Sequence, residues 1–392
     1  MANTSRQFEA FARKRGYPFL TICGGPQDRT HTEGSATRIT RRRGRIGFAL
    51  DKKHDYDLAF WRHYNSAAEA VRAFDPDIVH ITGPSDAGQL GALVAHRLQV
   101  PLAASWHTNV HQYAEQRAAW LLDFFPPSPR QQVGWLIRES ALKATLRFYK
   151  IPRVLFAPNP ELAKMLELGT GKPVYPMQRG VETELFSPKK RDRPHGPFIL
   201  GYVGRLTIEK NIRFLAELER TLLESGFAGF RFSIVGQGGE EDWLKTNMRQ
   251  ANFAGVLHGE DLARAYANMD VFVFPSHTDT FGNVVLEALA SGVPAIVTDR
   301  GGPQFIVRHG ETGFVAQNSS EFAPYVRHLA ADAPRLQAMR EAARSAAMQA
   351  SWDSIFEGVY AGYRRELRNC DARSRKARVR PQPTGAAPRP AE

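Results

Sequence analysis

Cysteine is scarce in this chain of 392 residues, which contains only Cys23 and Cys370. Two cysteines so far apart in sequence cannot build the disulfide framework of a small secreted domain, and they are too few for a zinc cluster. Long apolar runs are also absent, so the sequence predicts no segment that spans a bilayer. Residues 1–17 are polar and amphipathic and lack the apolar core of a secretory signal. We therefore expect an intracellular protein in a reducing compartment, the cytoplasm.

Acidic residues are outnumbered, because 52 Lys and Arg face 40 Asp and Glu and give a formal charge of +12. Part of the excess lies in residues 370–392, a basic tail rich in Pro and Ala that we expect to be disordered. Another part lies in residues 38–45, "RITRRRGR", which predict either a solvated basic loop or a surface that attracts anionic lipid or nucleic acid. The sequence has no helix-turn-helix, zinc-finger or RNA-binding motif, so we expect no nucleic-acid partner.

Short apolar strands alternate with amphipathic helices almost throughout, a pattern typical of parallel sheets with crossover helices. The alternation pauses once, in a stretch rich in Pro, Gly and charge. The sequence therefore predicts an α/β protein with two Rossmann-like, doubly wound domains that face each other across a cleft. The expected boundaries are an N-terminal domain over 1–180, a linker over 181–197, a second domain over 198–345, a helical segment over 346–369 that packs back on the first domain, and the tail over 370–392.

Open parallel sheets bind ligands beyond the carboxyl ends of their strands, and several informative residues follow predicted strands there. His107 follows "PLAASW", and Gly204 and Arg205 follow "ILGYV". Arg205 and Lys210 lie five positions apart in one loop, which suits a diphosphate, although two surface charges would look the same. Gly236 belongs to "IVGQGGE", which resembles a dinucleotide-binding loop but lacks the full glycine pattern and is a weak signal alone.

The stretch "SHTDTFGNVVLEALASGVPAI", residues 276–296, places two acids around a predicted helix start. Asp279 lies in the loop after an apolar strand, and the helix should begin near Gly282 or Asn283. Free amides of Gly282, Asn283 and Val284 could hold a phosphate. Glu287 is placed to accept hydrogen bonds from sugar hydroxyls. A single acid near a helix start can also serve only to offset the helix dipole.

Four motifs of the second half occur in a familiar order: "GRLTIEKN", "VGQG", "PSHTDTFGNVVLEALASGVP" and "DRGG". With the looser matches "DIVHITGP", "SWHT" and "RGVETELF" in the first half, they resemble the retaining glycosyltransferases of family 4, also called group 1, which have the GT-B fold. Within that family the chain looks most similar to bacterial mannosyl- and sulfoquinovosyl-type lipid glycosyltransferases. The resemblance implies an enzyme that moves a hexose-type sugar from a nucleoside-diphosphate sugar to a lipid or glycan acceptor, without a metal or other cofactor.

The resemblance also implies roles for single residues. His107 and Asp279 would be catalytic, close to the transferred sugar. Glu287 would bind the ribose, and the donor-binding set would further contain Gly204, Arg205, Lys210, Gly236, Gly282, Asn283 and Val284. Asp279 departs from the family pattern, which usually has Glu at this position, so its carboxylate has a shorter reach.

A larger departure concerns the beginning of the chain, "SRQFEAFARKRGYPF", which looks like the first helix of the family without the strand and glycine loop before it. We therefore expect the first strand to be missing. This departure keeps open the alternative of a non-catalytic protein that binds nucleotide sugars. A sugar-nucleotide epimerase of the same fold is the other alternative that the sequence leaves open.

Two further features concern partners. The triplets Asp55-Tyr56-Asp57 and Asp75-Pro76-Asp77 could suggest a metal site, but they precede apolar segments of the first half, and we expect no metal there. Residues 120–135, "WLLDFFPPSPRQQVGW", predict either a core helix that ends at Pro126 or an apolar rim that docks on a membrane beside residues 38–45. The second option would make the protein peripheral on the inner face of the cell membrane.

Overall fold

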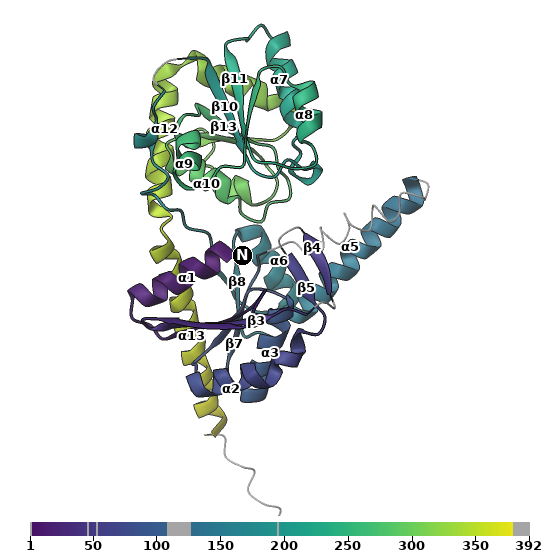
Figure 1. The fold of residues 1–392 in the computed structure, drawn as a ribbon, viewed down its shortest axis with the longest axis vertical. Coiled ribbons are helices and arrows are strands. Elements are labelled where there is room, and N and C mark those ends of the chain that lie inside the picture. The colour runs from purple at the N-terminus through teal and green to yellow at the C-terminus, as the bar shows by residue number, and fades with distance from the viewer. Residues whose placement is uncertain (1, 45–46, 52–53, 108–126, 194–195, 379–392) are drawn as a thin grey trace, which may run out of the picture.

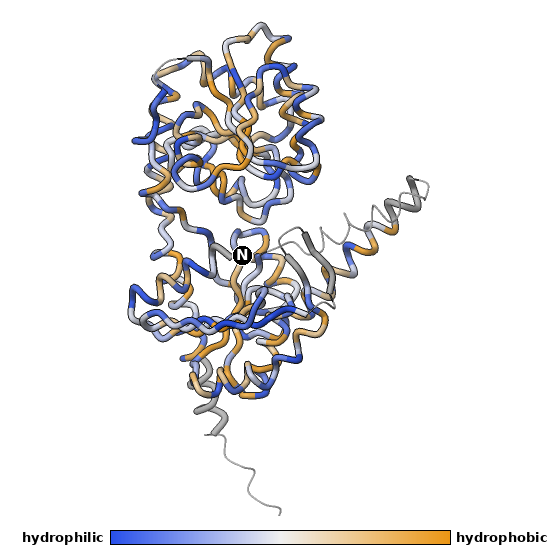
Figure 2. The backbone as a smooth tube through the Cα atoms, viewed as in Figure 1, coloured by the Kyte–Doolittle hydropathy of each residue, from blue (hydrophilic) through white to orange (hydrophobic). Residues whose placement is uncertain are grey.

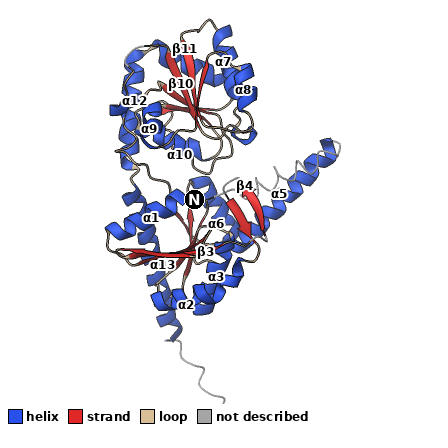
Figure 3. Cartoon of the chain, viewed as in Figure 1, coloured by secondary structure: helices blue, strands red, loops and turns tan. Residues whose placement is uncertain are grey.

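The computed structural model describes residues 2–44, 47–51, 54–107, 127–193 and 196–378 and shows two α/β domains arranged along the long axis of the molecule (Figure 1). Strands lie between helices in both domains, which confirms the predicted α/β class (Figure 3). The N-terminal domain contains α1 (Ala2–Lys14), β1 (Phe19–Gly25), β2 (Arg29–Glu33), β3 (Ala36–Arg42), β4 (Gly47–Asp51), β5 (His54–Asp57), α2 (Tyr64–Phe74), β6 (Val79–Ile81), α3 (Asp86–Leu98), β7 (Leu102–Ser105), α5 (Pro127–Tyr149), β8 (Val154–Ala157), α6 (Pro160–Thr170) and β9 (Val174–Pro176).

The C-terminal domain is built on a six-stranded parallel sheet in the order β12-β11-β10-β13-β14-β15. The order reverses between β10 and β13, which makes the sheet doubly wound and creates a switch point where loops diverge and leave room for a ligand. The elements are β10 (Phe198–Val203), α7 (Phe214–Glu224), β11 (Phe230–Val235), α8 (Glu241–Asn247), β12 (Ala251–Gly255), α9 (Gly259–Ala267), β13 (Val271–Phe274), α10 (Asn283–Ala290), β14 (Ala295–Thr298), β15 (Gly313–Ala316), α11 (Phe322–Ala331) and α12 (Ala333–Gln349).

The central strands of the C-terminal domain are mostly apolar because helices cover both faces of the sheet. Every residue of β13 and β14 is buried. Figure 2 shows the same pattern, with hydrophobic strands inside and hydrophilic turns of the helices outside. One continuous hydrophobic core fills this domain, whereas the described part of the N-terminal domain forms three smaller clusters.

The N-terminal domain divides its strands among several sheets. β6, β7, β8 and β9 form a parallel sheet in sequence order, and β1 pairs in parallel with β3 in a second sheet, where β2 adds an antiparallel strand. The β2–β3 hairpin turns through Gly34 and Ser35, with Gly34 at φ +57°. Glycine at the first position of a two-residue turn matches the twist of the flanking strands.

The last helix, α13 (Trp352–Arg378), returns to the N-terminal domain and packs against α1. The rings of Phe8 and Phe356 stack with centroids 4.4 Å apart, and Arg15 pairs with Glu357 at 2.8 Å. The helix continues to Arg378, so the prediction of a disordered tail from residue 370 is wrong for residues 370–378. These residues are rich in Arg, Lys and Ala, which favour helix, and the first proline after them is Pro381. Residues 379–392 lie outside the described residues.

The basic segment over 38–45 is not the loop that the sequence predicts, because its residues up to Arg42 belong to β3. Arg38 donates to Glu9 at 2.6 Å, and Arg43 makes two hydrogen bonds to the buried carboxylate of Asp86, at 3.0 and 3.1 Å. The local sequence cannot reveal these partners, which come from distant positions. Arg42 remains exposed, and Arg41 is partly exposed. Arg45 lies outside the described residues.

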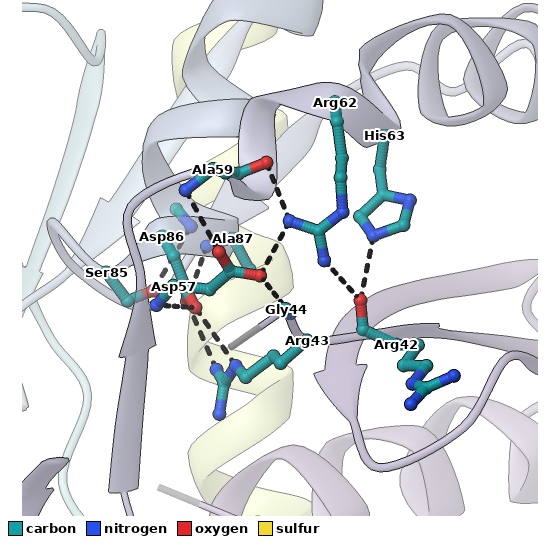
Figure 4. A network of polar contacts seen from close by, with 11 residues as sticks. Arg42, Arg43, Gly44, Asp57, Ala59, Arg62, His63, Ser85, Asp86 and Ala87 are labelled. Atoms are coloured by element: carbon teal, nitrogen blue, oxygen red, sulfur yellow. Dashed lines mark hydrogen bonds and ion pairs between the residues drawn. The ribbon is translucent and has the colours of Figure 1, made fainter. Parts of the chain in front are cut away.

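Asp57, from the first acidic triplet, is buried in the network drawn in Figure 4. It accepts hydrogen bonds from the amide of Gly44 at 2.6 Å and from Arg62 at 2.8 Å, and its own amide donates to Asp86. The arrangement ties β3, β5 and the start of α3 together. Within the described ranges, no group of three or more His, Cys, Asp and Glu residues is placed to hold a metal ion.

The predicted aromatic segment over 120–135 is only partly described, and the option of a core helix ending at Pro126 falls in residues 108–126, outside the described residues. α5 starts at Pro127 and projects from the domain (Figure 1). Its residues Val133, Trp135 and Leu136 are exposed, Trp135 by 57%. Among the helices of the described residues, none combines the length and apolar character needed to cross a membrane.

Candidate functional site

A pocket of about 320 Å³ lies where the two domains meet. Its walls come from the loops after β10 and β13 and from the start of α10. Among the described residues of the N-terminal domain, Arg179 also lines it. β10 and β13 flank the switch point of the C-terminal sheet, so the topology itself brings these loops together. The lining residues are Arg179, Val203, Gly204, Arg205, Lys210, Phe274, Asp279, Thr280, Phe281, Gly282, Asn283 and Val284.

Two glycines allow the loop after β10 to fold closely. Gly204 has φ +155°, in the region that favours glycine. Gly236, which follows β11, does not line the pocket but lies behind Gly204. A Cβ atom on Gly236 would stand 1.9 Å from the carbonyl oxygen of Gly204. The structure thus places Gly236 as a support of the loop that carries Arg205.

The first turn of α10 faces the pocket, as the sequence predicts for a helix that starts near Gly282 or Asn283. Gly282 precedes the helix with φ +101°, and Asn283 is its first residue. Amide groups in a first helical turn have no partner within the helix, and the helix dipole adds positive potential. Gly282, Asn283 and Val284 therefore present amide groups and positive potential to this wall of the pocket, an arrangement typical of anion sites.

Lys210 and Asp279 contact each other across the pocket. The ammonium of Lys210 donates to both carboxylate oxygens of Asp279, at 2.7 and 2.8 Å. The side chain of Lys210 is 13% exposed and that of Asp279 21%. Arg205 lies 3.4 Å from Glu209. Both predicted cations thus line the pocket, and each has an acidic neighbour that fixes its position.

Glu287 lies on α10 behind the pocket wall and is not one of the lining residues. Its carboxylate accepts a hydrogen bond from the hydroxyl of Tyr266 at 2.9 Å. Burial raises the pKa of Glu287 to about 7, and Tyr266 partly opposes this by stabilising the ionised form. Glu287 can therefore change its charge near neutral pH. Tyr266 lies 21 positions earlier, on α9, and no motif in the sequence pointed to it.

His107 lies just after β7 and is buried at the contact between the domains. Its Nε2 atom is 2.6 Å from Ser105 Oγ, and its Nδ1 atom is 2.8 Å from Nη2 of Arg179. Its carbonyl accepts a hydrogen bond from Thr280, a pocket residue, at 3.2 Å. Burial, followed by the neighbouring charge of Arg179, holds the pKa of His107 well below its ordinary value.

Arg179 is the charged pocket residue that sequence reasoning missed. It follows β9, at the carboxyl end of the N-terminal sheet, and it begins the stretch "RGVETELF". The rule that ligand-binding residues follow parallel strands would have selected it. The structure thus brings most of the predicted set to one pocket, adds Arg179, and places His107, Gly236 and Glu287 in the layer behind.

Comparisons with known proteins agree with this architecture. Residues 3–185 match the model of Glycosyltransferase Family 4, and residues 184–346 match that of Glycosyl transferases group 1. A GDP-mannose-dependent alpha-mannosyltransferase of Mycobacterium tuberculosis is 32% identical over 75% of this chain and 74% of that protein. One from Mycolicibacterium smegmatis is 33% identical over 76% and 77%. A sulfoquinovosyl transferase of Arabidopsis thaliana is 30% identical over 62% of this chain and 48% of that protein.

Solved structures show the same fold at lower identity. Sucrose-phosphate synthase from Thermosynechococcus elongatus superposes with a TM-score of 0.66 at 18% identity, covering 93% of each chain. Anabaena Alr3699/HepE in complex with UDP and glucose superposes with a TM-score of 0.63 at 16% identity, covering 91% of this chain and 95% of that one.

The two-domain fold, shared with these solved structures, is that of the GT-B class. The chain belongs to the family 4, or group 1, retaining glycosyltransferases, which use nucleotide sugars. The predicted family, fold and enzyme class are thus confirmed, and the similarities favour neither a sugar-nucleotide epimerase nor a non-catalytic binding protein.

Proposed function

We propose that this enzyme transfers a mannosyl residue from GDP-mannose to a hydroxyl group of a lipid or glycan acceptor, without a metal ion. The observation that carries the proposal is the pocket at the domain contact, where Arg179, Arg205, Lys210 and the first turn of α10 surround a space of about 320 Å³. The choice of GDP-mannose rests on the relatives from Mycobacterium tuberculosis and Mycolicibacterium smegmatis, which are named for that donor.

In this proposal the diphosphate lies against Arg205, Lys210 and the amides of Gly282 to Val284. Arg205 and Lys210 make charge-assisted hydrogen bonds with the phosphate oxygens, and the helix start adds its amides and dipole. The nucleoside extends past the lining residues of this pocket toward α10, where Glu287 accepts hydrogen bonds from the ribose hydroxyls. Asp279 holds Lys210 in place and lies beside the donor sugar.

The chemical step breaks the bond between the anomeric carbon and the leaving phosphate oxygen, and forms a bond from that carbon to the acceptor oxygen on the same face. The sugar ring gains oxocarbenium character, while negative charge grows on the GDP that leaves. The acceptor hydroxyl passes its proton to the leaving phosphate oxygen, so the products are the glycosylated acceptor and GDP. The fixed cations stabilise the growing charge because they are already oriented before the reaction.

The same cations make a metal ion unnecessary in our proposal. A divalent metal commonly neutralises a leaving diphosphate. Here Arg205 and Lys210 are positioned to provide that charge, and the α10 amides add to it. Turnover should therefore persist after dialysis against a chelator.

We further propose that the acceptor is a lipid at the inner face of the cell membrane. α5 carries exposed apolar side chains at Val133, Trp135 and Leu136. The same helix has exposed basic residues at Lys143 and Arg147. Aromatic insertion combined with cationic attraction holds peripheral proteins on anionic lipid. This surface supports a cytoplasmic, peripheral enzyme.

The test of the donor is a binding and turnover comparison with GDP-mannose, UDP-glucose and UDP-sulfoquinovose. We expect GDP-mannose to bind and to release GDP faster when a membrane extract supplies acceptor lipids. Preferential binding of either UDP sugar would overturn the choice of donor. Failure of all three to bind folded protein would overturn the proposed site.

A further inference from the structure

Arg179 carries a buried positive charge at the pocket without a matching negative one. The residue is 7% exposed. Its guanidinium contacts Thr4 Oγ1 of α1 and Nδ1 of His107, and both partners are neutral. No carboxylate pairs with it among the residues that the structure describes. Burial lowers the pKa of Arg179 to about 10, so the group is still charged at neutral pH. A buried charge is costly unless an opposite charge joins it.

A chain of hydrogen bonds fixes the orientation of this guanidinium. An arginine can only donate, so Nδ1 of His107 must accept from it and the proton of His107 must be on Nε2. Nε2 then donates to Ser105 Oγ at 2.6 Å. The Ser105 hydroxyl in turn donates to Nε2 of His80 at 2.9 Å, and Nδ1 of His80 contacts the hydroxyl of Tyr363 on α13.

Each member of this chain other than Arg179 is uncharged. Burial lowers the pKa of His80 to about 4, in line with a neutral ring that accepts from Ser105. The chain therefore holds the guanidinium in one direction and leaves its charge uncompensated. A rigid, uncompensated cation at the wall of a pocket is a site for an anion.

Opposite Arg179, the C-terminal domain presents further groups that attract anions. Arg205, Lys210 and the α10 residues Gly282 to Val284 line the same pocket. Asp279 offsets the charge of Lys210, and Glu209 lies beside Arg205, whereas Arg179 has only neutral contacts among the described residues. Of these cations, Arg179 is the one whose positive charge an anionic ligand would neutralise.

We propose that Arg179 binds the diphosphate of the donor from the N-terminal domain, and that His107 is the residue that positions it. This inference rests on the proposed function, because it takes the pocket to be the donor site. Diphosphate binding would then bridge the two domains, with Arg179 on one side and Arg205 and Lys210 on the other. His107, which the family resemblance places beside the sugar, would act through Arg179 by fixing its guanidinium.

The experiment measures affinities of wild type and variants for GDP, GMP and guanosine by titration calorimetry. Arg179→Met removes the charge at similar length, and Arg220→Met changes an exposed arginine on α7 as the matched control. We expect Arg179→Met to weaken GDP by about 10- to 100-fold, GMP less, and guanosine hardly at all, because a charge-assisted contact is lost. The control should bind all three like wild type. Equal GDP affinity in Arg179→Met and wild type would overturn the proposal.

A double-mutant cycle tests the role of His107. His107→Leu should weaken GDP in the wild-type background and have little further effect in the Arg179→Met background, because its contribution passes through Arg179. A merely structural histidine would instead lower the melting temperature in both backgrounds and weaken guanosine as much as GDP, which would overturn the positioning role. Circular dichroism before each titration shows that the variants are folded.

Two other outcomes distinguish an error in the role of Arg179 from an error in the proposed donor site. If folded wild type binds neither GDP nor UDP, the proposed donor site is wrong, and with it the role of Arg179 in diphosphate binding. If Arg179→Met binds GDP normally but has a raised KM for the acceptor, the anion that Arg179 recognises is a phosphate of the acceptor, which overturns the donor assignment.

Discussion

Asp279 and Lys210 illustrate how one ion pair can serve two purposes at a phosphate-binding pocket. The carboxylate holds the ammonium with two short hydrogen bonds, yet its own negative charge repels an arriving diphosphate. In the proposed mechanism, this carboxylate opposes binding of the diphosphate in the ground state. It favours the transition state, because positive charge grows there on the sugar ring. Only interactions that strengthen in the transition state accelerate the reaction.

We expect Asp279→Asn to lower kcat while leaving GDP affinity unchanged or stronger. The amide removes the repulsion but no longer anchors Lys210 as a charged partner, and its contact with the donor sugar weakens. Steady-state kinetics combined with GDP titration distinguish the two effects. Glu209→Gln, at the neighbouring acid beside Arg205, serves as a comparison. Weakened GDP binding with normal kcat would show that Asp279 contacts the nucleotide rather than the sugar.

Glu287 should make stability depend on pH. Its pKa is about 7 in the folded protein against 4.5 for an ordinary glutamate, so the folded state holds the proton more tightly. The folded protein then binds more protons than the unfolded one between these values, and the free energy of unfolding falls as the pH rises through that window. Below 4.5 Glu287 is protonated in both the folded and the unfolded state, so the free energy of unfolding no longer depends on pH through this residue.

Glu287→Gln removes this dependence. As the pH rises from about 5 to about 8, the free energy of unfolding of the variant should increase by about 2 kcal/mol relative to that of wild type. This is less than the full pKa shift would give, because the carboxylate is not fully enclosed. Urea unfolding at both pH values measures the difference. Glu224→Gln, at an exposed acid on α7, is the control and should show no such change. If Glu287→Gln shows the same loss of stability between the two pH values as wild type, another titrating group causes that loss.

At the scale of elements, the contact of α1 with α13 joins the two ends of the described chain. Phe356 is completely buried between the rings of Phe8 and Trp352. Phe356→Ala should cost about 3–5 kcal/mol in the free energy of unfolding, through lost burial and the cavity that remains. Denaturant unfolding measures it, with Leu168→Ala, 79% exposed, as the control. A cost below 1 kcal/mol would mean that this contact contributes little to stability.

Local pattern predicted much of the C-terminal domain. The buried strand β13 is apolar along its length, and β14 is apolar up to Thr298. The glycine before α10 marks the start of that helix, so the pocket wall from Asp279 to Val284 could be placed from the sequence. Register and pairing between distant strands have no such local signature. The pairing of β1 with β3, and the contacts of Arg38 with Glu9 and Arg43 with Asp86, therefore emerged only in three dimensions.

The same distinction applies within the site. Arg205 and Lys210 share one loop, and their spacing alone suggested a common ligand. The partner of His107 lies 72 positions away on another strand end, and that of Glu287 lies on another helix. Each of these depends on the packing of whole elements. This explains why the lining residues were easier to predict than the residues that support them.

At the scale of the whole molecule, a net charge of +12 favours association with anionic surfaces, but part of that charge is used internally. Arg43 compensates the buried Asp86 and Arg38 pairs with Glu9, so neither is free for lipid. The exposed Arg42 and the partly exposed Arg41 remain, together with the apolar and basic face of α5. A useful variant must therefore spare Arg43, whose loss would leave a buried carboxylate unpaired.

We expect wild type to cosediment with vesicles that contain anionic phospholipid at low salt, and to be released at high salt. Changing both Arg41 and Arg42 to Ser should weaken binding by about 1 kcal/mol for each charge. Trp135→Ser should weaken it at both salt concentrations, because its contribution is hydrophobic rather than electrostatic. Changing Arg220 and Arg308, exposed in the C-terminal domain, to Ser is the matched control for net charge. If wild type ignores anionic vesicles at low salt, or the control loses as much binding as the Arg41 and Arg42 variant, a specific membrane-docking face is wrong and a water-soluble glycan becomes the better acceptor.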